Sequence, residues 1–133
     1  MIVGIGIDAV QISRMEKWAG DPLLLNRYFD TRELDVIRPG NSQAAGLQKP
    51  GKGMVRSLAA HFAAKEAFAK ALGTGFAGLV LRDIMVLKDQ KERPFLCLKK
   101  SARKAMKAAG AERVHISLTH EGNMAFASVI LET

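Results

Sequence analysis

The stretch Arg56-Ser-Leu-Ala-Ala-His-Phe-Ala-Ala-Lys-Glu-Ala-Phe-Ala-Lys-Ala-Leu-Gly73 predicts one long helix, around which the rest of the fold must be arranged. Its apolar residues recur at intervals of three and four, so they share a face, and Glu66 projects into the middle of that face. A carboxylate in such a place needs a cation, because an unpaired buried charge is costly to desolvate. Lys70, one turn later, is the nearest candidate for a salt bridge. The residues that share the face with Glu66 are Val55, Leu58, Ala59, Phe62 and Ala69.

Residues 2–10 have the alternation of a strand, with one face that is almost bare. That face carries Gly4, Gly6 and Asp8, because alternate residues of a strand point the same way. Two glycines beneath a carboxylate allow another backbone or a ligand to approach closely. An edge strand that tolerates glycine, with Asp8 in a turn, is the other interpretation. The opposite face carries Val3, Ile5 and Ile7.

The order of the remaining elements favours a mixed α+β domain over a doubly wound sheet, because single strands and helices do not alternate regularly. Capping patterns predict helices that begin at Ser13 and at Asp30, the first of them ended by Gly20 and Pro22. Glycines and prolines in residues 39–53 predict a mobile loop. Further expected elements are a helix over 54–72 capped by Gly73, strands over 79–88 and 94–98, a helix over 101–109, and a hairpin of 114–120 with 124–131.

The size and composition of the chain suit a single domain over residues 1–133. Hydrophobic residues make up 48% of it, and no apolar run approaches the roughly 20 residues of a membrane span. The N-terminus has no signal-peptide pattern, so we expect a cytoplasmic protein that does not enter a membrane. The single cysteine, Cys97, can form neither a disulfide nor a thiolate zinc site.

The net charge of +7 implies an acidic partner, which could be nucleic acid, a phosphorylated small molecule or an acidic protein. The basic residues are scattered, and few aromatic residues are available to stack on bases. Nucleic acid is therefore the weaker option.

The segment Gly73-Thr-Gly-Phe-Ala-Gly78 matches the GxGxxG pattern of dinucleotide-binding loops. Such a loop follows a strand and opens a helix, whereas this one follows a helix, so the Rossmann interpretation fails. A helix cap with a turn is one alternative. A loop whose backbone amides approach a phosphate is the other.

Asp8 and Glu66 are the two carboxylates that could act together, because two carboxylates can hold Mg²⁺ while a phosphate substrate supplies further oxygens. The histidines show no zinc-ligand spacing. His120 lies at the end of the predicted 114–120 strand and could be a structural residue facing the core or a group at the sheet's end.

Three segments together resemble one family, the holo-acyl-carrier-protein synthases, which are small 4'-phosphopantetheinyl transferases. They are Gly4-Ile-Gly-Ile-Asp8 with Arg14, then Phe62-Ala-Ala-Lys-Glu-Ala-Phe-Ala-Lys-Ala-Leu-Gly-Thr-Gly75, then His115-Ile-Ser-Leu-Thr-His120. The resemblance also includes Phe29-Asp-Thr-Arg-Glu33 and extends in order from Ile2 to Glu132.

The resemblance implies an antiparallel sheet against a long central helix, assembled as a homotrimer with active sites between subunits. It implies transfer of 4'-phosphopantetheine from coenzyme A to a serine of apo acyl carrier protein, in fatty acid biosynthesis, with Mg²⁺ as cofactor. By analogy, Asp8 and Glu66 hold the metal and Lys70 lies near the reacting phosphate. Glu66 or a metal-bound water could take the serine proton; Lys70 could do so only with a strongly lowered pKa. The residues expected to line the coenzyme A site are Lys65, Gly73, Thr74, Gly75, Ser117 and His120.

The acidic partner then becomes an acyl carrier protein, which would dock on Arg14 and Lys17, with Arg27 as a further contact. Two features depart from the family pattern. His61 stands where many relatives have arginine, and the loop over 39–53 is longer than usual, so the match of Lys49, Lys52 or Arg56 to the family's basic residues is ambiguous. The alternative function is a noncatalytic basic module that binds nucleotides or RNA.

Overall fold

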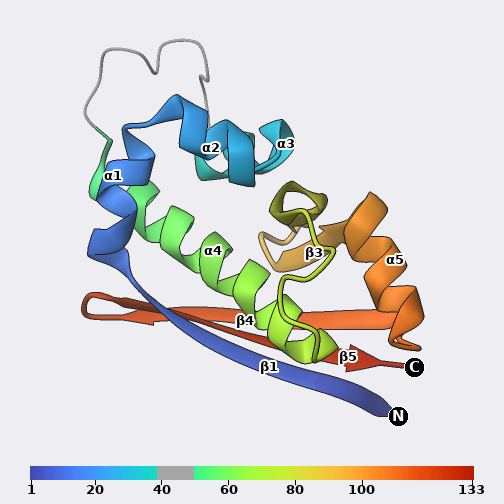
Figure 1. Ribbon diagram of the computed structural model, residues 1–133. Coiled ribbons are helices and arrows are strands. Elements are labelled where there is room, and N and C mark those ends of the chain that lie inside the picture. Colours follow the sequence, from blue (N-terminus) through green and yellow to red (C-terminus); the bar gives the residue numbers. More distant parts are fainter. Residues whose placement is uncertain (39–49) are drawn as a thin grey trace.

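The computed structural model describes residues 1–38 and 50–133. The strands are β1 (Ile2–Gln11), β2 (Ile84–Lys88), β3 (Pro94–Leu98), β4 (Arg113–Glu121) and β5 (Met124–Glu132). The helices are α1 (Glu16–Ala19), α2 (Pro22–Tyr28), α3 (Thr31–Ile37), α4 (Lys52–Leu72) and α5 (Lys100–Ala108). In Figure 1, α4 lies across one face of the sheet formed by β1, β5 and β4, and α1, α2 and α3 lie on the other side of α4. No helix in the described part of the chain is long and apolar enough to cross a bilayer.

The α+β expectation is confirmed. All strand pairs are antiparallel, in the order β1-β5-β4 for the main sheet and β2-β3 for the small one. Asp8 of β1 and Leu118 of β4 both pair with Ala127 of β5, which lies between them. The strand predicted over 79–88 begins only at Ile84, because Leu81–Asp83 forms a 3-10 turn.

The helix starts were predicted less well. Pro22 was expected to end a helix, but it is the first residue of α2, where its missing N–H costs nothing. The Asp21 side chain caps α2 by accepting from the backbone N–H groups of Leu23 and Leu24. Ser13 does not cap a helix; it lies in a 3-10 turn and hydrogen-bonds Asn123 of the β4–β5 turn.

Of three other helix starts, one is as expected and two differ from the prediction. Asp30 caps α3 as expected, by accepting from the backbone N–H of Arg32 at 2.9 Å. Helix α4 begins at Lys52, inside the predicted loop, whose residues 39–49 lie outside the described part. Helix α5 begins one residue before Ser101, whose hydroxyl donates to Asp83 at 2.6 Å instead of capping the helix.

The glycines of β1 are in contact with the backbone of α4. A Cβ on Gly4 would lie 2.0 Å from the carbonyl oxygen of Ala71, and one on Gly6 would lie 1.9 Å from that of Ala67. Real Cβ atoms do not come so close, so only glycine permits this approach. The interpretation that another backbone approaches the bare face of β1 is therefore confirmed, and the neighbouring face of α4 is correspondingly rich in alanine.

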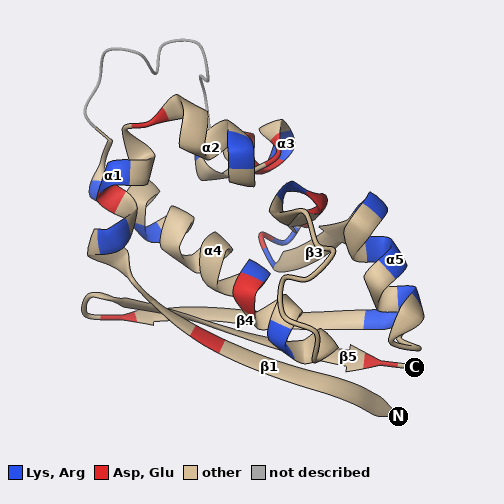
Figure 2. Cartoon of the chain, viewed as in Figure 1, with Lys and Arg blue, Asp and Glu red and all other residues tan. Residues whose placement is uncertain are grey.

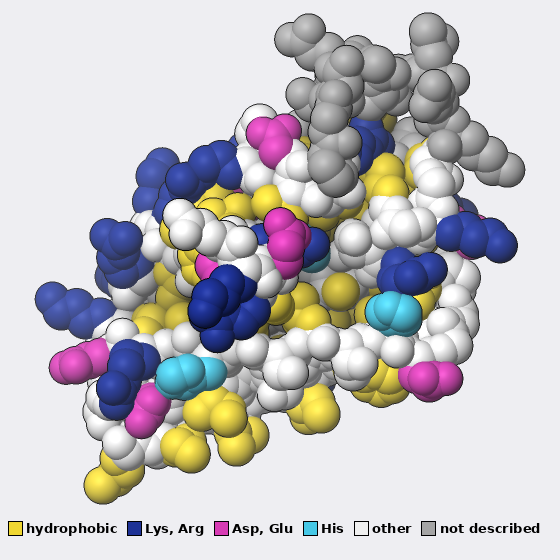
Figure 3. All heavy atoms as spheres, turned by 180° about the vertical axis from the view of Figure 1, so that it is seen from behind, with side chains coloured by type: hydrophobic (Ala, Val, Ile, Leu, Met, Phe, Trp, Pro, Cys, Tyr) yellow, Lys and Arg dark blue, Asp and Glu magenta, His cyan; other side chains and the backbone are white. Residues whose placement is uncertain are grey.

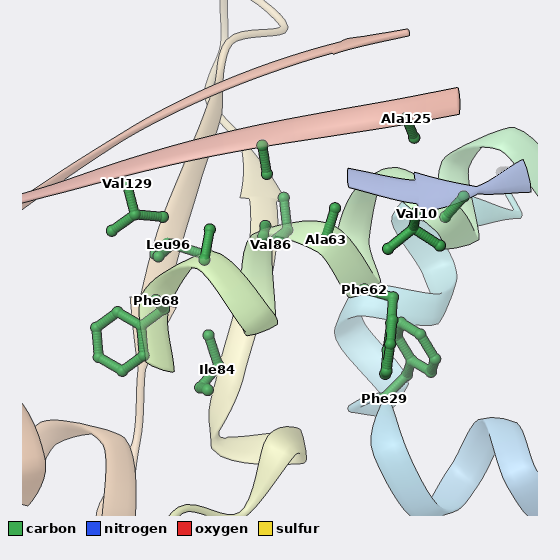
Figure 4. Packing of buried hydrophobic residues seen from close by; sticks show 14 of the residues in the cluster. Val10, Phe29, Phe62, Ala63, Phe68, Ile84, Val86, Leu96, Ala125 and Val129 are labelled. Atoms are coloured by element: carbon green, nitrogen blue, oxygen red, sulfur yellow. The ribbon is translucent and has the colours of Figure 1, made fainter. Parts of the chain in front are cut away.

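Apolar side chains from both sides of α4 fill the core. Figure 4 shows part of this core, which includes Phe62 and Ala63 of α4 and Phe29 at the end of α2. Val129 and Val86, from the two sheets, are each no more than 1% exposed. The long helix is thus buried on more than one face, as its alanine content allows.

A charged cluster is also buried in this core. The Lys65 ammonium donates to Glu33 Oε1 at 2.7 Å and to the carbonyl oxygens of Leu81 and Ile84. Glu33 Oε2 accepts from the backbone N–H of Val86 and lies 3.0 Å from His61 Nδ1. Lys65 and Glu33 are both fully buried, so each charge depends on the other. The cluster joins α3, α4 and β2.

The outer face of the main sheet is apolar and uncovered along β1 and part of β5, whereas the side chains of β4 on this face are polar. Ile5 and Ile7 of β1 are 66% and 65% exposed, and Ile5 pairs with Ile130 of β5. Phe126, on the same face of β5, is half-buried. Figure 3 shows hydrophobic side chains projecting from the lower rim of the molecule, where the sheet lies. We call the surface of Val3, Ile5, Ile7, Phe126 and Ile130 the outer apolar face.

The contact between β1 and α4 can be tested by adding one methyl group. Gly6→Ala should lower the free energy of unfolding by at least about 3 kcal/mol, because its Cβ would collide with the backbone of α4. The matched control is Gly53→Ala, in the first turn of α4 and facing open space, which should gain up to about 1 kcal/mol. Chemical denaturation measures both values, and equal stability of the two variants would contradict the packing described here.

Candidate active site

The close approach of α4 to β1 brings Asp8 and Glu66 together. Asp8 lies two residues beyond Gly6 on the face covered by α4, and Glu66 precedes Ala67, the residue in contact with that glycine. Figure 2 shows the single acidic segment of β1 near the single acidic segment of α4. Asp8 is 8% exposed, whereas Glu66 is half-buried. The pairing expected from the sequence is therefore formed within one chain.

Each oxygen of Asp8 has a different environment. Oδ1 accepts from the Lys70 ammonium at 2.8 Å, and this ammonium also donates to the carbonyl oxygen of Ile7 at 3.1 Å. Oδ2 is buried and has no hydrogen-bond partner among the described residues. A buried carboxylate oxygen without a partner is unusual and marks a place for a ligand.

The charge interactions of Asp8 and Glu66 are not those first expected from the sequence, in which Lys70 was the salt-bridge partner of Glu66. Burial, followed by the charge of the neighbouring Asp8 and a hydrogen bond with it, raises the pKa of Glu66 to about 7, against the weaker opposing effects of Arg14 and Lys70. Lys70 instead pairs with Asp8, and the hydrogen bond between them raises the pKa of Lys70. Lys70 is therefore unsuited to act as a base. Glu66 is poised to gain or lose a proton near neutral pH.

These residues fit a divalent metal ion. The orphaned Oδ2 of Asp8 and the carboxyl of Glu66 are hard oxygen donors, the kind that Mg²⁺ prefers. No cluster of three or more histidine, cysteine or acidic residues capable of holding a metal is found in residues 1–38 and 50–133. Two carboxylates leave room for water and for phosphate oxygens in the coordination sphere of the metal.

Lys65 is the one expected ligand-binding residue that the structure places elsewhere. It was expected near coenzyme A, but its ammonium is fully buried and hydrogen-bonded to Glu33 and two carbonyl oxygens. The helical rotation of 100° per residue directs Lys65 and Glu66 to different surroundings. Lys65 is therefore a core residue and is not available to a ligand on the surface.

The other expected ligand-binding residues are exposed but lie apart. Gly73 and Gly75 have positive φ angles of 77° and 62°, and they flank exposed Thr74 just beyond the end of α4. This loop begins two residues after Ala71, whose backbone contacts Gly4 near the start of β1. His120 instead pairs with Ala125, which in turn pairs with Val10 near the end of β1. The six residue-to-residue steps from Gly4 to Val10 span about 20 Å. Ser117 lies on the opposite face of β4 from His120. A single chain therefore does not bring all of these residues together.

The basic residues expected to dock a partner are all exposed. Arg14, in the turn after β1, is close enough to Glu66 to lower its pKa. Lys17 lies on α1, and Arg27 lies on α2 with its guanidinium 5.6 Å from the centre of the Tyr28 ring. Because α2 was not expected, the sequence did not show that Arg27 stands on a helix.

One hollow beside the site was missed from the sequence. Its volume is about 500 Å³, and it lies at the end of β1 that follows Asp8. Glu16 and Asn123 are far apart in the sequence and come together there only in the folded chain, so no local sequence pattern predicts this hollow. Lys52 and Arg56, the ambiguous basic residues of the sequence, both line it. The remaining lining residues are Ile12, Pro50, Val55 and Gly122.

The raised pKa of Glu66 predicts how stability depends on pH in the metal-free protein. The folded carboxyl holds its proton up to about pH 7, whereas in the unfolded chain it loses it near the ordinary value of 4.5. The contribution of Glu66 is thus fully present below pH 4.5 and is lost as the pH rises through 7. With allowance for solvent screening, wild-type protein should lose about 1 kcal/mol between pH 5 and 8 relative to Glu66→Gln.

Denaturation in EDTA at several pH values measures this difference. Glu112→Gln, an exposed acidic residue outside the site, is the matched control and should follow the wild-type pH profile. If the stability of wild type and that of Glu66→Gln changed with pH in parallel, the pKa of Glu66 would not be raised in the folded protein.

Known proteins with similar sequences and structures agree with this geometry. The family model of the 4'-phosphopantetheinyl transferase superfamily matches residues 4–124. A holo-[acyl-carrier-protein] synthase of Treponema denticola is 48% identical over 132 residues, which are 99% of each chain. One from Trichlorobacter lovleyi is 45% identical over 135 residues, covering 99% of this chain and 98% of the relative. The crystal structure of a holo-(acyl-carrier-protein) synthase from Bacillus anthracis in complex with CoA (3',5'-ADP) is 30% identical, with a TM-score of 0.74 over 100% of this chain and 98% of that one. The chain therefore belongs to the 4'-phosphopantetheinyl transferase superfamily.

Proposed function

We propose that residues 1–133 act as one holo-acyl-carrier-protein synthase domain, which transfers 4'-phosphopantetheine from coenzyme A to a serine of apo acyl carrier protein. The products are holo acyl carrier protein and 3',5'-ADP. The observation that carries the proposal is the Asp8–Glu66 pair with its orphaned oxygen, beside the cations Lys70 and Arg14. The relatives named holo-[acyl-carrier-protein] synthase and the Bacillus anthracis complex support the same activity.

The residues of the chain mainly position groups and balance charge in this reaction. The serine oxygen attacks the phosphorus on the pantetheine side, and the bond from that phosphorus to 3',5'-ADP breaks. Lys70 carries its positive charge to the phosphate oxygens, since its raised pKa keeps it protonated. The Glu66 carboxylate is a candidate acceptor for the serine proton.

Mg²⁺ is the proposed cofactor, held by Asp8 and Glu66. When bound, it would neutralise the pyrophosphate of coenzyme A and supply the positive charge that the two carboxylates lack. Coenzyme A itself would extend to the exposed loop in which Gly73 and Gly75, both with positive φ angles, flank Thr74.

A homotrimer would complete the site. His120 and Ser117 lie far from the glycine loop within one chain, so a neighbouring copy would have to bring them to coenzyme A. The outer apolar face offers the surface for such a contact, because Ile5 and Ile7 are two-thirds exposed and continuous with β5. Uncovered apolar surface of this kind is typical of an interface.

The acidic carrier protein would dock on Arg14, which lies close enough to act on Glu66, and on Lys17 of α1 and Arg27 of α2. Complementary charge speeds encounter and orients the partner. We place the reaction in fatty acid biosynthesis in the cytoplasm, where neither a nucleic acid nor a membrane takes part.

The transfer reaction can be measured by mass. The protein is incubated with coenzyme A, Mg²⁺ and apo acyl carrier protein, and the carrier should gain the mass of one phosphopantetheine. Glu66→Gln should lower the rate at least about 100-fold while leaving the fold intact, because the neutral amide is a poorer ligand for Mg²⁺ and cannot accept the serine proton. Glu112→Gln should retain the wild-type rate. An unmodified carrier under conditions where another synthase succeeds would reject the proposed function, and unchanged transfer by Glu66→Gln would reject the role of that residue.

Assembly can be measured independently of activity. Light scattering should give the mass of three chains for the wild type and a smaller mass for Ile5→Glu, because a charge would then stand on the outer apolar face. Leu23→Glu, which changes an 83% exposed leucine on α2, should leave the mass unchanged. A wild-type mass of one chain would remove the trimer from the proposal.

A further inference from the structure

We infer that Lys70 is an exchangeable counter-ion of Asp8: it occupies the carboxylate in the metal-free protein and is released towards the substrate phosphate when a divalent ion binds. The inference rests on the proposed function, because it assumes that Asp8 and Glu66 receive the metal. It adds an order of events within the site, in which metal binding makes the lysine available.

In the Asp8–Lys70 ion pair, Asp8 is the fixed partner and Lys70 is the movable one. Asp8 is 8% exposed and is anchored in β1, whereas the Lys70 side chain is 55% exposed and reaches the carboxylate from the last turn of α4. Its two hydrogen bonds, to Asp8 Oδ1 and to the carbonyl oxygen of Ile7, both lie at the rim of the site. Because the incoming divalent ion would itself neutralise the buried Asp8, release of the mostly exposed lysine would not leave that carboxylate uncompensated.

The second oxygen of Asp8 shows where the incoming cation would bind. Oδ2 is buried and without a partner in the described residues, and Glu66 lies next to it. A divalent ion bound there would stand on the same carboxylate as the lysine ammonium. Two like charges on one carboxylate repel strongly in a partly buried site, and the ammonium is the one on a flexible stem.

The other lysine in this part of α4, Lys65, differs from Lys70 in a way that supports an exchangeable role for Lys70. The Lys65 ammonium is fully buried, with three hydrogen-bond acceptors around it, and has no route to solvent. Lys70 has two acceptors and an open side. The two lysines of α4 therefore divide into a permanent core cation and an exchangeable surface one.

The first test measures affinity for Mn²⁺ alone, by the paramagnetic resonance of the free ion, without coenzyme A or carrier protein. Lys70→Gln should bind Mn²⁺ about fivefold more tightly than wild type, because the competing cation is gone. Arg14→Gln removes a positive charge that also acts on Glu66 but is not bonded to Asp8, so its effect should be clearly smaller. Equal effects of the two variants, or no gain for Lys70→Gln, would overturn the inference.

The second test observes the lysine ammonium groups by ¹⁵N–¹H correlation spectroscopy. Ion-paired ammonium groups exchange slowly and give signals, and the signal absent from Lys70→Gln identifies Lys70. Saturating Mg²⁺ should abolish or shift this signal, while that of buried Lys65 persists as an internal control. An unchanged Lys70 signal would show that the lysine keeps its place. Because neither readout needs turnover, transfer activity with a static Lys70 would reject only this inference, whereas exchange without transfer would reject only the proposed function.

Discussion

The contact between the backbones of β1 and α4 determines where the chemistry of this protein can occur. Gly4 and Gly6 let the carbonyl oxygens of Ala71 and Ala67 lie where side chains would otherwise stand. This contact sets the height of the helix above the sheet, and the next inward-facing residue of the strand, Asp8, then meets Glu66. Two carboxylates held on regular elements keep their separation better than groups on loops. The carboxylate pair is thus a direct result of glycine spacing.

A second constraint holds the opposite side of the helix. Lys65 and Glu33 neutralise each other in the core, and the remaining hydrogen-bonding groups of the pair are satisfied by His61 and by backbone atoms of β2 and the turn before it. A buried ion pair is weak evidence for stability, because desolvation offsets its attraction. Its hydrogen bonds do tie α3, α4 and β2 to one another, since the groups that satisfy the pair come from all three elements. His61 takes part in this arrangement, which explains its burial without a nucleotide contact.

The sequence predicted what depends on local periodicity and missed what depends on distant partners. The long helix, β1 and the β4–β5 hairpin follow from spacing and turn residues, and their positions are confirmed. Helix α2 was missed because Pro22 both ends and begins helices, and the choice depended on Asp21 as a cap. Lys65 was misassigned for a different reason. Adjacent charged residues on a helix look alike in sequence, and only Glu33, 32 positions away, shows which of them is in the core.

The divergence of Lys65 and Glu66 also limits how α4 can turn about its own axis. Any twist that moved Glu66 towards or away from Asp8 would withdraw Lys65 from Glu33 and from two carbonyl oxygens at the same time. The core cluster thus acts as a torsional lock on the helix. Adjustment to a ligand is therefore left to side-chain rotamers. Insertion of one residue in α4 before Lys65 would rotate all preceding residues of the helix by about 100° relative to the site. Such an insertion would have to displace one end of the helix or the other.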